Sequence, residues 1–231
     1  ALASASKIDV RILRERPGED TSVINMEAAS HIQLTLKVKT EEVRVPNVVG
    51  MLPGSDPALR HQYIGVGAHL DHEGVRDGVV YPGADDDASG STALLLVAKA
   101  VTTNPMKPRR SVVFMAFCGE ELGLIGSRYY TDHPIMPLGN MSCLLQMDMV
   151  GRNESFPNAN PPERPEDNVN TIHLIGSKRI STELHQVTMD MNGYIGFEFE
   201  WDEEDVYTRS DHANFAKEGV PITFLFSGFH P

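Results

Sequence analysis

Three short stretches of the chain place imidazole or carboxylate side chains next to glycine, at residues 67–72 (GAHLDH), 83–90 (GADDDASG) and 118–124 (CGEELGL). Glycine lets the backbone turn sharply and approach a ligand closely. Asp148, which follows an apolar run, and His212 add one more carboxylate and one more imidazole. Nitrogen and oxygen donors of these types are ligands of zinc-like ions. The set could bind two metal ions and leave one carboxylate as a base, which favours a metal-dependent hydrolase.

His69 is the strongest candidate for a metal-binding imidazole. A single histidine after a strand is more often a structural residue, but here Asp71 follows two positions later. A carboxylate at that position can accept the second ring N–H and select the tautomer that binds a metal. His72 lacks such a partner, and we expect it to be an ordinary loop residue.

Two groups of adjacent carboxylates suggest a division of roles. Asp85, Asp86 and Asp87 repel one another, and a nearby dication would relieve that repulsion. We expect Asp86 to bridge two metals and Asp87 to cap the following helix. Glu120 and Glu121 are predicted to open a helix, where the dipole favours negative charge. Their side chains would leave the axis about 100° apart, so one can bind a metal while the other holds the nucleophilic water.

Asp148 and His212 complete the proposed set of metal ligands, and the sequence evidence is stronger for Asp148. Asp148 ends an apolar strand, where an unpaired charge would be costly and a metal would remove the cost. The alternative for His212 is an ordinary residue at the start of a helix. We include it because the count of ligands calls for a second imidazole.

The intervening sequence predicts strands and helices in alternation. Period-two patterns and buried apolar runs predict strands at residues 7–13, 31–39, 47–52, 62–68, 111–117, 142–147, 171–175 and 221–226. Helical spacing of apolar residues predicts helices at 88–101, 120–130, 180–191 and 211–217. Residues 153–170 contain four prolines and are expected to form a long loop.

This alternation predicts an α/β fold with three layers, in which a mixed, mostly parallel central sheet is covered by helices on both faces. His69, Glu120, Glu121 and Asp148 all follow predicted strands. Ligands of open α/β sheets bind at the carboxyl ends of the strands. The fold and the candidate residues therefore predict the same edge of the sheet as the metal site.

Composition limits the partners of the protein. The net charge of −12 argues against nucleic acid and anionic membranes. The longest apolar helical run is well short of the roughly 20 residues that span a bilayer. Cys118 and Cys143 lie in apolar runs and are expected to be buried free thiols. The acidic stretch at 198–205 is expected to be a solvated loop, with a role in receiving a cationic amino terminus as the alternative.

Five motifs in order, GAHLDH, GADDDASG, GEELGLIGS, MDMVGR and RSDHANF, resemble the di-zinc aminopeptidases of clan MH, peptidase family M28. Secreted bacterial leucyl aminopeptidases and aminopeptidase Y belong to this family, and the motifs extend over residues 65–226. The resemblance implies a residue for each role: His69 and Asp148 on one zinc, Glu121 and His212 on the other, Asp86 bridging both, Glu120 as general base, and Asp71 behind His69.

The resemblance implies three further features. The first is a non-proline cis peptide after Asp86. The second is an oxyanion contact from Tyr207 or Arg209, because Asp211 stands where some relatives carry a tyrosine for that purpose. The third is cleavage of the first peptide bond of peptides with a free amino terminus, by two zinc ions for which cobalt or manganese could substitute. We expect a secreted, periplasmic or cell-envelope location.

Alternatives on the same fold are distinguished by their residues. A glutaminyl cyclase-like acyltransferase would need a changed ligand set. A glutamate carboxypeptidase-like hydrolase would need arginines around the pocket, for which Arg152 and Arg209 are the candidates. A non-catalytic receptor domain would have lost ligands. We expect residues 1–231 to form a single catalytic domain, with strands in 1–45 that flank an absent domain and a truncated C-terminal end.

Overall fold

The computed structural model describes residues 21–24, 34–37, 42–159, 161–201 and 206–230. The chain divides into two compact units, Ala1–Arg44 and Val45–Pro231. In the first unit, β1 (Thr21–Ile24) pairs antiparallel with β2 (Leu34–Lys37). The predicted strand at 31–39 contains β2, and the one at 7–13 lies outside the described residues.

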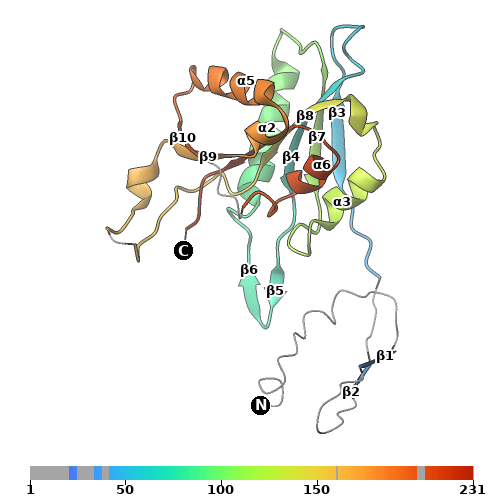
Figure 1. Ribbon diagram of the computed structural model, residues 1–231, viewed down its shortest axis with the longest axis vertical. Helices are drawn as coiled ribbons and strands as arrows, with labels where there is room; N and C mark the ends of the chain where they lie inside the picture. The colour runs from blue at the N-terminus through green and yellow to red at the C-terminus, as the bar shows by residue number, and fades with distance from the viewer. Residues whose placement is uncertain (1–20, 25–33, 38–41, 160, 202–205, 231) are drawn as a thin grey trace. The chain divides into compact units, whose positions relative to one another are not determined.

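A seven-stranded sheet forms the centre of the second unit, within the residues described there (Figure 1). Its order is β10-β9-β11-β8-β4-β7-β3. The strands are β3 (Val48–Leu52), β4 (Tyr63–His69), β7 (Ser111–Phe117), β8 (Met141–Met147), β9 (Thr171–Ile175), β10 (Glu198–Trp201) and β11 (Ile222–Phe226). Strands β7, β4, β8 and β11 are mutually parallel. Strand β3 runs antiparallel to β7, and β9 runs antiparallel to β11 but parallel to β10. The predicted mixed, mostly parallel sheet is confirmed.

Helices cover both faces of this sheet. The alternation of β7 sends Met115 and Phe117 to a face where they pack against Tyr130 and Phe215. These two aromatic residues come from α3 (Ile125–Asp132) and α6 (His212–Lys217).

The opposite face of the sheet carries two other helices. There Val66 packs against Leu94 of α2 (Ala88–Thr103). The same face meets α5 (Thr182–Asn192), which follows the short α4 (Ser177–Ile180). The three-layer arrangement is confirmed.

The structure adds elements that the sequence patterns did not predict. A hairpin of β5 (Gly74–Arg76) and β6 (Val79–Tyr81) follows the GAHLDH segment. Part of the predicted acidic loop is strand β10, which pairs with β9. Short 3-10 helices occur at Leu138–Asn140 and, within the predicted loop at 153–170, at Pro165–Asn168.

The predicted helix at 120–130 is wrong in its first half. α3 begins only at Ile125, because Gly123 and Leu124 adopt positive φ angles of 101° and 58° and interrupt regular helix geometry. The two glutamates at 120 and 121 therefore lie in a turn after β7. The helix dipole does not explain their placement.

Two smaller expectations are also settled by the fold. Cys118 and Cys143 are free and buried, as predicted. Among the described helices, none combines the length and the apolar character that crossing a bilayer requires.

The start of α2 is pressed against β8 at Gly90. A Cβ atom at this position would lie 2.5 Å from the carbonyl oxygen of Met147 and 2.3 Å from the Asp87 carboxylate. We expect Gly90→Ala to lower the free energy of unfolding by about 1–3 kcal/mol, because backbone has to move to admit the methyl group. Urea denaturation measures this change. Gly139→Ala is the control, since its Cβ would meet nothing within 4 Å. Equal stability of the two variants would contradict the close packing of α2.

Candidate metal centre

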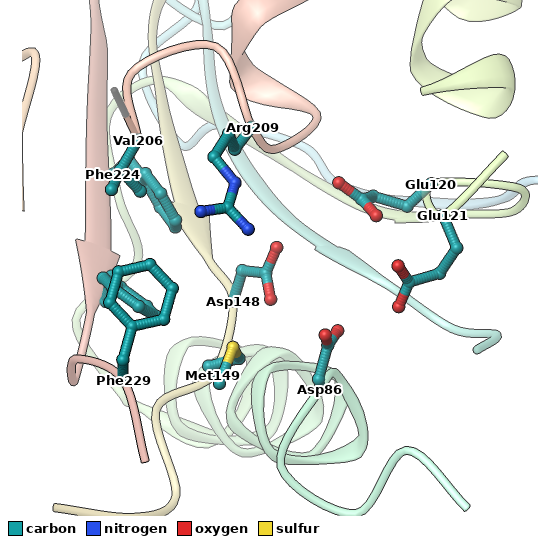
Figure 2. Close-up of a pocket in the computed structure, with 10 residues that line it drawn as sticks. Asp86, Glu120, Glu121, Asp148, Met149, Val206, Arg209, Phe224 and Phe229 are labelled. Carbon is teal, nitrogen blue, oxygen red and sulfur yellow. The ribbon is translucent and has the colours of Figure 1, made fainter. Parts of the chain in front are cut away.

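Loops at the carboxyl ends of three neighbouring strands bring the predicted residues together. His69 ends β4, Asp148 follows β8 and Glu120 follows β7, and β4 lies between the other two strands. Asp86 precedes α2 and completes the group. Figure 2 shows the carboxylates of Asp86, Glu120, Glu121 and Asp148 directed into one pocket, which all four line. The predicted edge of the sheet therefore holds the candidate site.

His69 is oriented as a metal ligand would be. Its ring is fully buried, and Nδ1 lies 2.8 Å from the main-chain oxygen of Asp71, which can only accept a proton. Nε2 then faces Asp86 Oδ1 at 3.0 Å and Asp148 Oδ1 at 3.5 Å. Burial lowers the pKa of His69, but the carboxylates of Asp148 and Asp86 outweigh it and raise the pKa to about 12. The position attracts positive charge, and a metal cation fits it.

Asp71 acts differently from the expectation. We expected its carboxylate to bind the second ring nitrogen of His69, but the main-chain oxygen does so. The carboxylate instead accepts the main-chain N–H of Gly119, at 2.8 and 2.9 Å, and the Cys118 thiol at 2.9 Å. Gly119 has a φ of 73°, a backbone conformation that favours glycine, and its N–H points to Asp71 in the loop that follows β4. Asp71 therefore holds the turn that carries Glu120.

The three consecutive aspartates separate into two structural residues and one residue directed into the pocket. Asp87 caps α2 by accepting the N–H of Gly90 at 2.9 Å, as predicted, and it also accepts the N–H groups of His69 and Met149. Asp85 accepts the N–H of Gly151 at 2.8 Å and contacts His230 Nε2 at 2.6 Å. Only the carboxylate of Asp86 is left for the pocket. The peptide bond after it is cis, as the resemblance implied.

Carboxylate crowding governs the electrostatics of the pocket. Burial and then the charge of Asp148 raise the pKa of Glu120 to about 9. Burial and then Asp86 raise the pKa of Glu121. Asp148 keeps one oxygen toward His69, while the other accepts a hydrogen bond from Ser210 at 2.7 Å. A cation among these side chains would offset their repulsion, so the residues present fit a metal centre.

His72 was not expected in the site, yet the structure places it there. Its Nδ1 lies 2.5 Å from Glu121 Oε1 and 3.8 Å from Asp86 Oδ1. Its place in the same glycine-flanked stretch as His69 was the available signal. That signal was too weak because a local pattern cannot tell which way a loop side chain turns.

His212 is not brought to the carboxylates. Its fully buried ring stacks on Phe224, with centroids 4.5 Å apart, and Nε2 lies 2.7 Å from the main-chain oxygen of Tyr207. Among the described residues, it belongs to none of the groups whose donor atoms gather within 4.8 Å. These contacts are those of a structural residue at the start of a helix, but Nδ1 is buried with no hydrogen-bond partner among the described residues. The assignment of His212 as a ligand therefore stays a prediction.

The two candidates for an oxyanion contact also separate. Arg209 lines the pocket together with Val206, Phe224 and Phe229 (Figure 2). Tyr207 does not line it, and its ring instead lies under the guanidinium of Arg179, 3.7 Å from ring centroid to Cζ.

The chain belongs to peptidase family M28, whose sequence profile matches residues 47–231. Leupeptin-inactivating enzyme 1 of Streptomyces exfoliatus is 33% identical over 183 residues, which are 79% of this chain and 36% of that protein. The family resemblance is thereby confirmed. The chain spans only about a third of the length of this relative.

Two solved structures share the fold. A zinc aminopeptidase from Bacillus subtilis has a TM-score of 0.60 at 23% identity, over 78% of this chain and 39% of its own. A glutaminyl cyclase from Porphyromonas gingivalis has a TM-score of 0.54 at 16% identity, over 89% and 68%. The same architecture thus serves different reactions, and the pocket residues have to discriminate between them.

The zinc content of two variants should distinguish the roles of His69 and His212. We expect His69→Asn to lose bound zinc, because it removes the imidazole that faces Asp86 and Asp148. His212→Asn should keep the wild-type zinc content but unfold about 2 kcal/mol more easily, because it breaks an aromatic stack in the core. Elemental analysis after dialysis and urea denaturation measure the two effects. Equal loss of zinc in both variants would identify His212 as a ligand.

Proposed function

We propose that this chain carries the catalytic centre of an aminopeptidase that hydrolyses the first peptide bond of peptides with a free amino terminus. The supporting observation is the meeting of one imidazole and four carboxylates in a single pocket at the carboxyl edge of the sheet. Family membership supports peptide hydrolysis as the reaction class. The Bacillus subtilis protein of the same fold is an aminopeptidase, which supports cleavage at the amino-terminal end of the substrate.

Four residues would hold a pair of zinc ions. Asp86 would be the residue shared by the two ions, a role supported by its contacts with His69 on one side and with His72, the partner of Glu121, on the other. Asp148 would join His69 on one ion, and Glu121 would bind the other. When bound, such ions lower the pKa of a water molecule and polarise a carbonyl group. Cobalt and manganese accept the same donors and are proposed as substitutes.

Glu120 is the proposed general base. It lines the pocket with the ligands, and its carboxylate forms no hydrogen bond with another described residue. A carboxylate that is free of structural contacts can accept a proton from the attacking water and return it to the leaving amine. Asp71 supports this role by holding the Cys118–Gly119 turn directly before Glu120.

The walls of the pocket suggest how a peptide would lie. Phe224, Phe226, Phe229 and Val206 form an apolar side that suits an apolar first side chain. Arg209 stands among them as the cationic group that could contact the scissile carbonyl oxygen. The acidic residues opposite would attract the free α-amine. Glutaminyl cyclisation is the competing reaction on this fold, and no feature of the pocket favours it over hydrolysis.

Glu120→Gln tests the assignment directly. The variant should lose at least about 100-fold in kcat on aminoacyl chromogenic substrates, because it removes the proton acceptor, while its zinc content stays at the wild-type level. Exposed Glu218→Gln is the control and should have full activity. An N-acetylated substrate should resist cleavage, and a glutaminyl peptide should be hydrolysed and not cyclised. Cleavage of blocked and free peptides at equal rates would refute the aminopeptidase assignment.

A further inference from the structure

A second group of metal-type donors lies outside the pocket. His173 is in β9, and its partner in the register of β10 is Glu200. Glu154, from the segment after β8, reaches the same point. One donor atom of each residue lies within 4.8 Å of the other two. Three separate segments of the chain therefore place a nitrogen and two carboxylate oxygens together.

The distances leave one nitrogen facing two carboxylates. His173 Nε2 is 3.2 Å from Glu154 Oε2 and also 3.2 Å from Glu200 Oε2. A ring nitrogen carries at most one proton, so it can donate a good hydrogen bond to only one of the two oxygens. The second carboxylate must then share another proton or meet a cation. A divalent ion between the three atoms would satisfy all of them at once.

Burial makes the unbalanced charge costly. Glu154 is 4% exposed and His173 is 5% exposed. The other ring nitrogen, Nδ1, is buried without a partner, and this disfavours a doubly protonated, charged ring. Among the described residues, neither carboxylate pairs with a lysine or an arginine. Burial, together with the nearby charge of Glu154, also raises the pKa of Glu200 despite the opposing effect of His173.

This group is connected to the wall of the pocket. Glu154 Oε1 accepts the main-chain N–H of Phe229 at 3.1 Å, and the Phe229 carbonyl accepts the N–H of Ser155 at 2.9 Å. The ring of His173 packs against Phe226 in a tilted arrangement, with centroids 5.5 Å apart. Phe226 and Phe229 both line the pocket. An ion bound behind them would hold this apolar wall against β9 and β10.

We propose that Glu154, His173 and Glu200 bind a divalent cation of the zinc class, separate from the centre at His69. The donors are the imidazole and carboxylates that zinc prefers, and the Glu200 side chain is 39% exposed, so water can fill the remaining coordination positions. The role is structural, because no group of the proposed catalytic set contributes to it.

Zinc titration of the stripped full chain, with bound zinc counted by elemental analysis at buffered free zinc, tests the proposal. His173→Asn should bind one zinc per chain fewer than the wild type. His69→Asn should retain that zinc and lose metal only from the pocket. Because the two losses are counted separately, failure of the pocket assignment and failure of this one are distinguishable.

Glu200→Gln keeps the test decisive if His173→Asn does not fold, since Glu200 is at the exposed side of the group. It should weaken zinc binding at this site at least about 10-fold, whereas Glu198→Gln, a loss of charge from the same strand, should leave it unchanged. Wild-type zinc stoichiometry and affinity in both His173→Asn and Glu200→Gln would overturn the proposal. The group would then be a carboxyl pair that shares a proton.

Discussion

Repulsion among carboxylates that share one small pocket is the constraint on which the second unit, Val45–Pro231, depends. Asp86, Glu120, Glu121 and Asp148 line the same pocket, and His69 is the imidazole buried among them. Such a group is unfavourable in a folded protein unless positive charge joins it. The raised pKa values of His69 and Glu120 express this demand. The unbalanced negative charge that a cation would offset is therefore concentrated in this pocket, at the carboxyl edge of the sheet.

Hydrogen bonds from main-chain N–H groups hold the loops that carry these carboxylates in place. Asp87 accepts three of them, from β4, from α2 and from the segment after β8, and so ties together the loops that carry His69, Asp86 and Asp148. Asp71 does the same for the turn before Glu120. The acidic residues that do not line the pocket thus act as the supports of those that do. This division explains why so many carboxylates are needed in so few residues.

The fold and much of the site could be predicted from the sequence. Period-two and helical patterns identified β4, β7, β8, β9, β11 and α2 closely, because buried faces impose their periodicity on the residues. His69, Asp86, Glu121 and Asp148 were found because they follow strands or stand beside glycine. The missed elements are short: β5 and β6 are exposed along their three residues, and β10 has only four residues, so burial leaves little pattern in them.

The sequence by itself determined the family, the layered sheet and the residue types of a metal pocket, since these follow from local pattern and motif order. Only the tertiary structure decided the use of each side chain. The His72 ring contacts Glu121, and the His212 ring stacks on Phe224. The Asp71 carboxylate accepts the main-chain N–H of Gly119, and does not bind the His69 ring. The tertiary structure also joined Glu154, His173 and Glu200. Such contacts depend on which distant segments meet and how each side chain rotates, and a linear pattern does not contain that information.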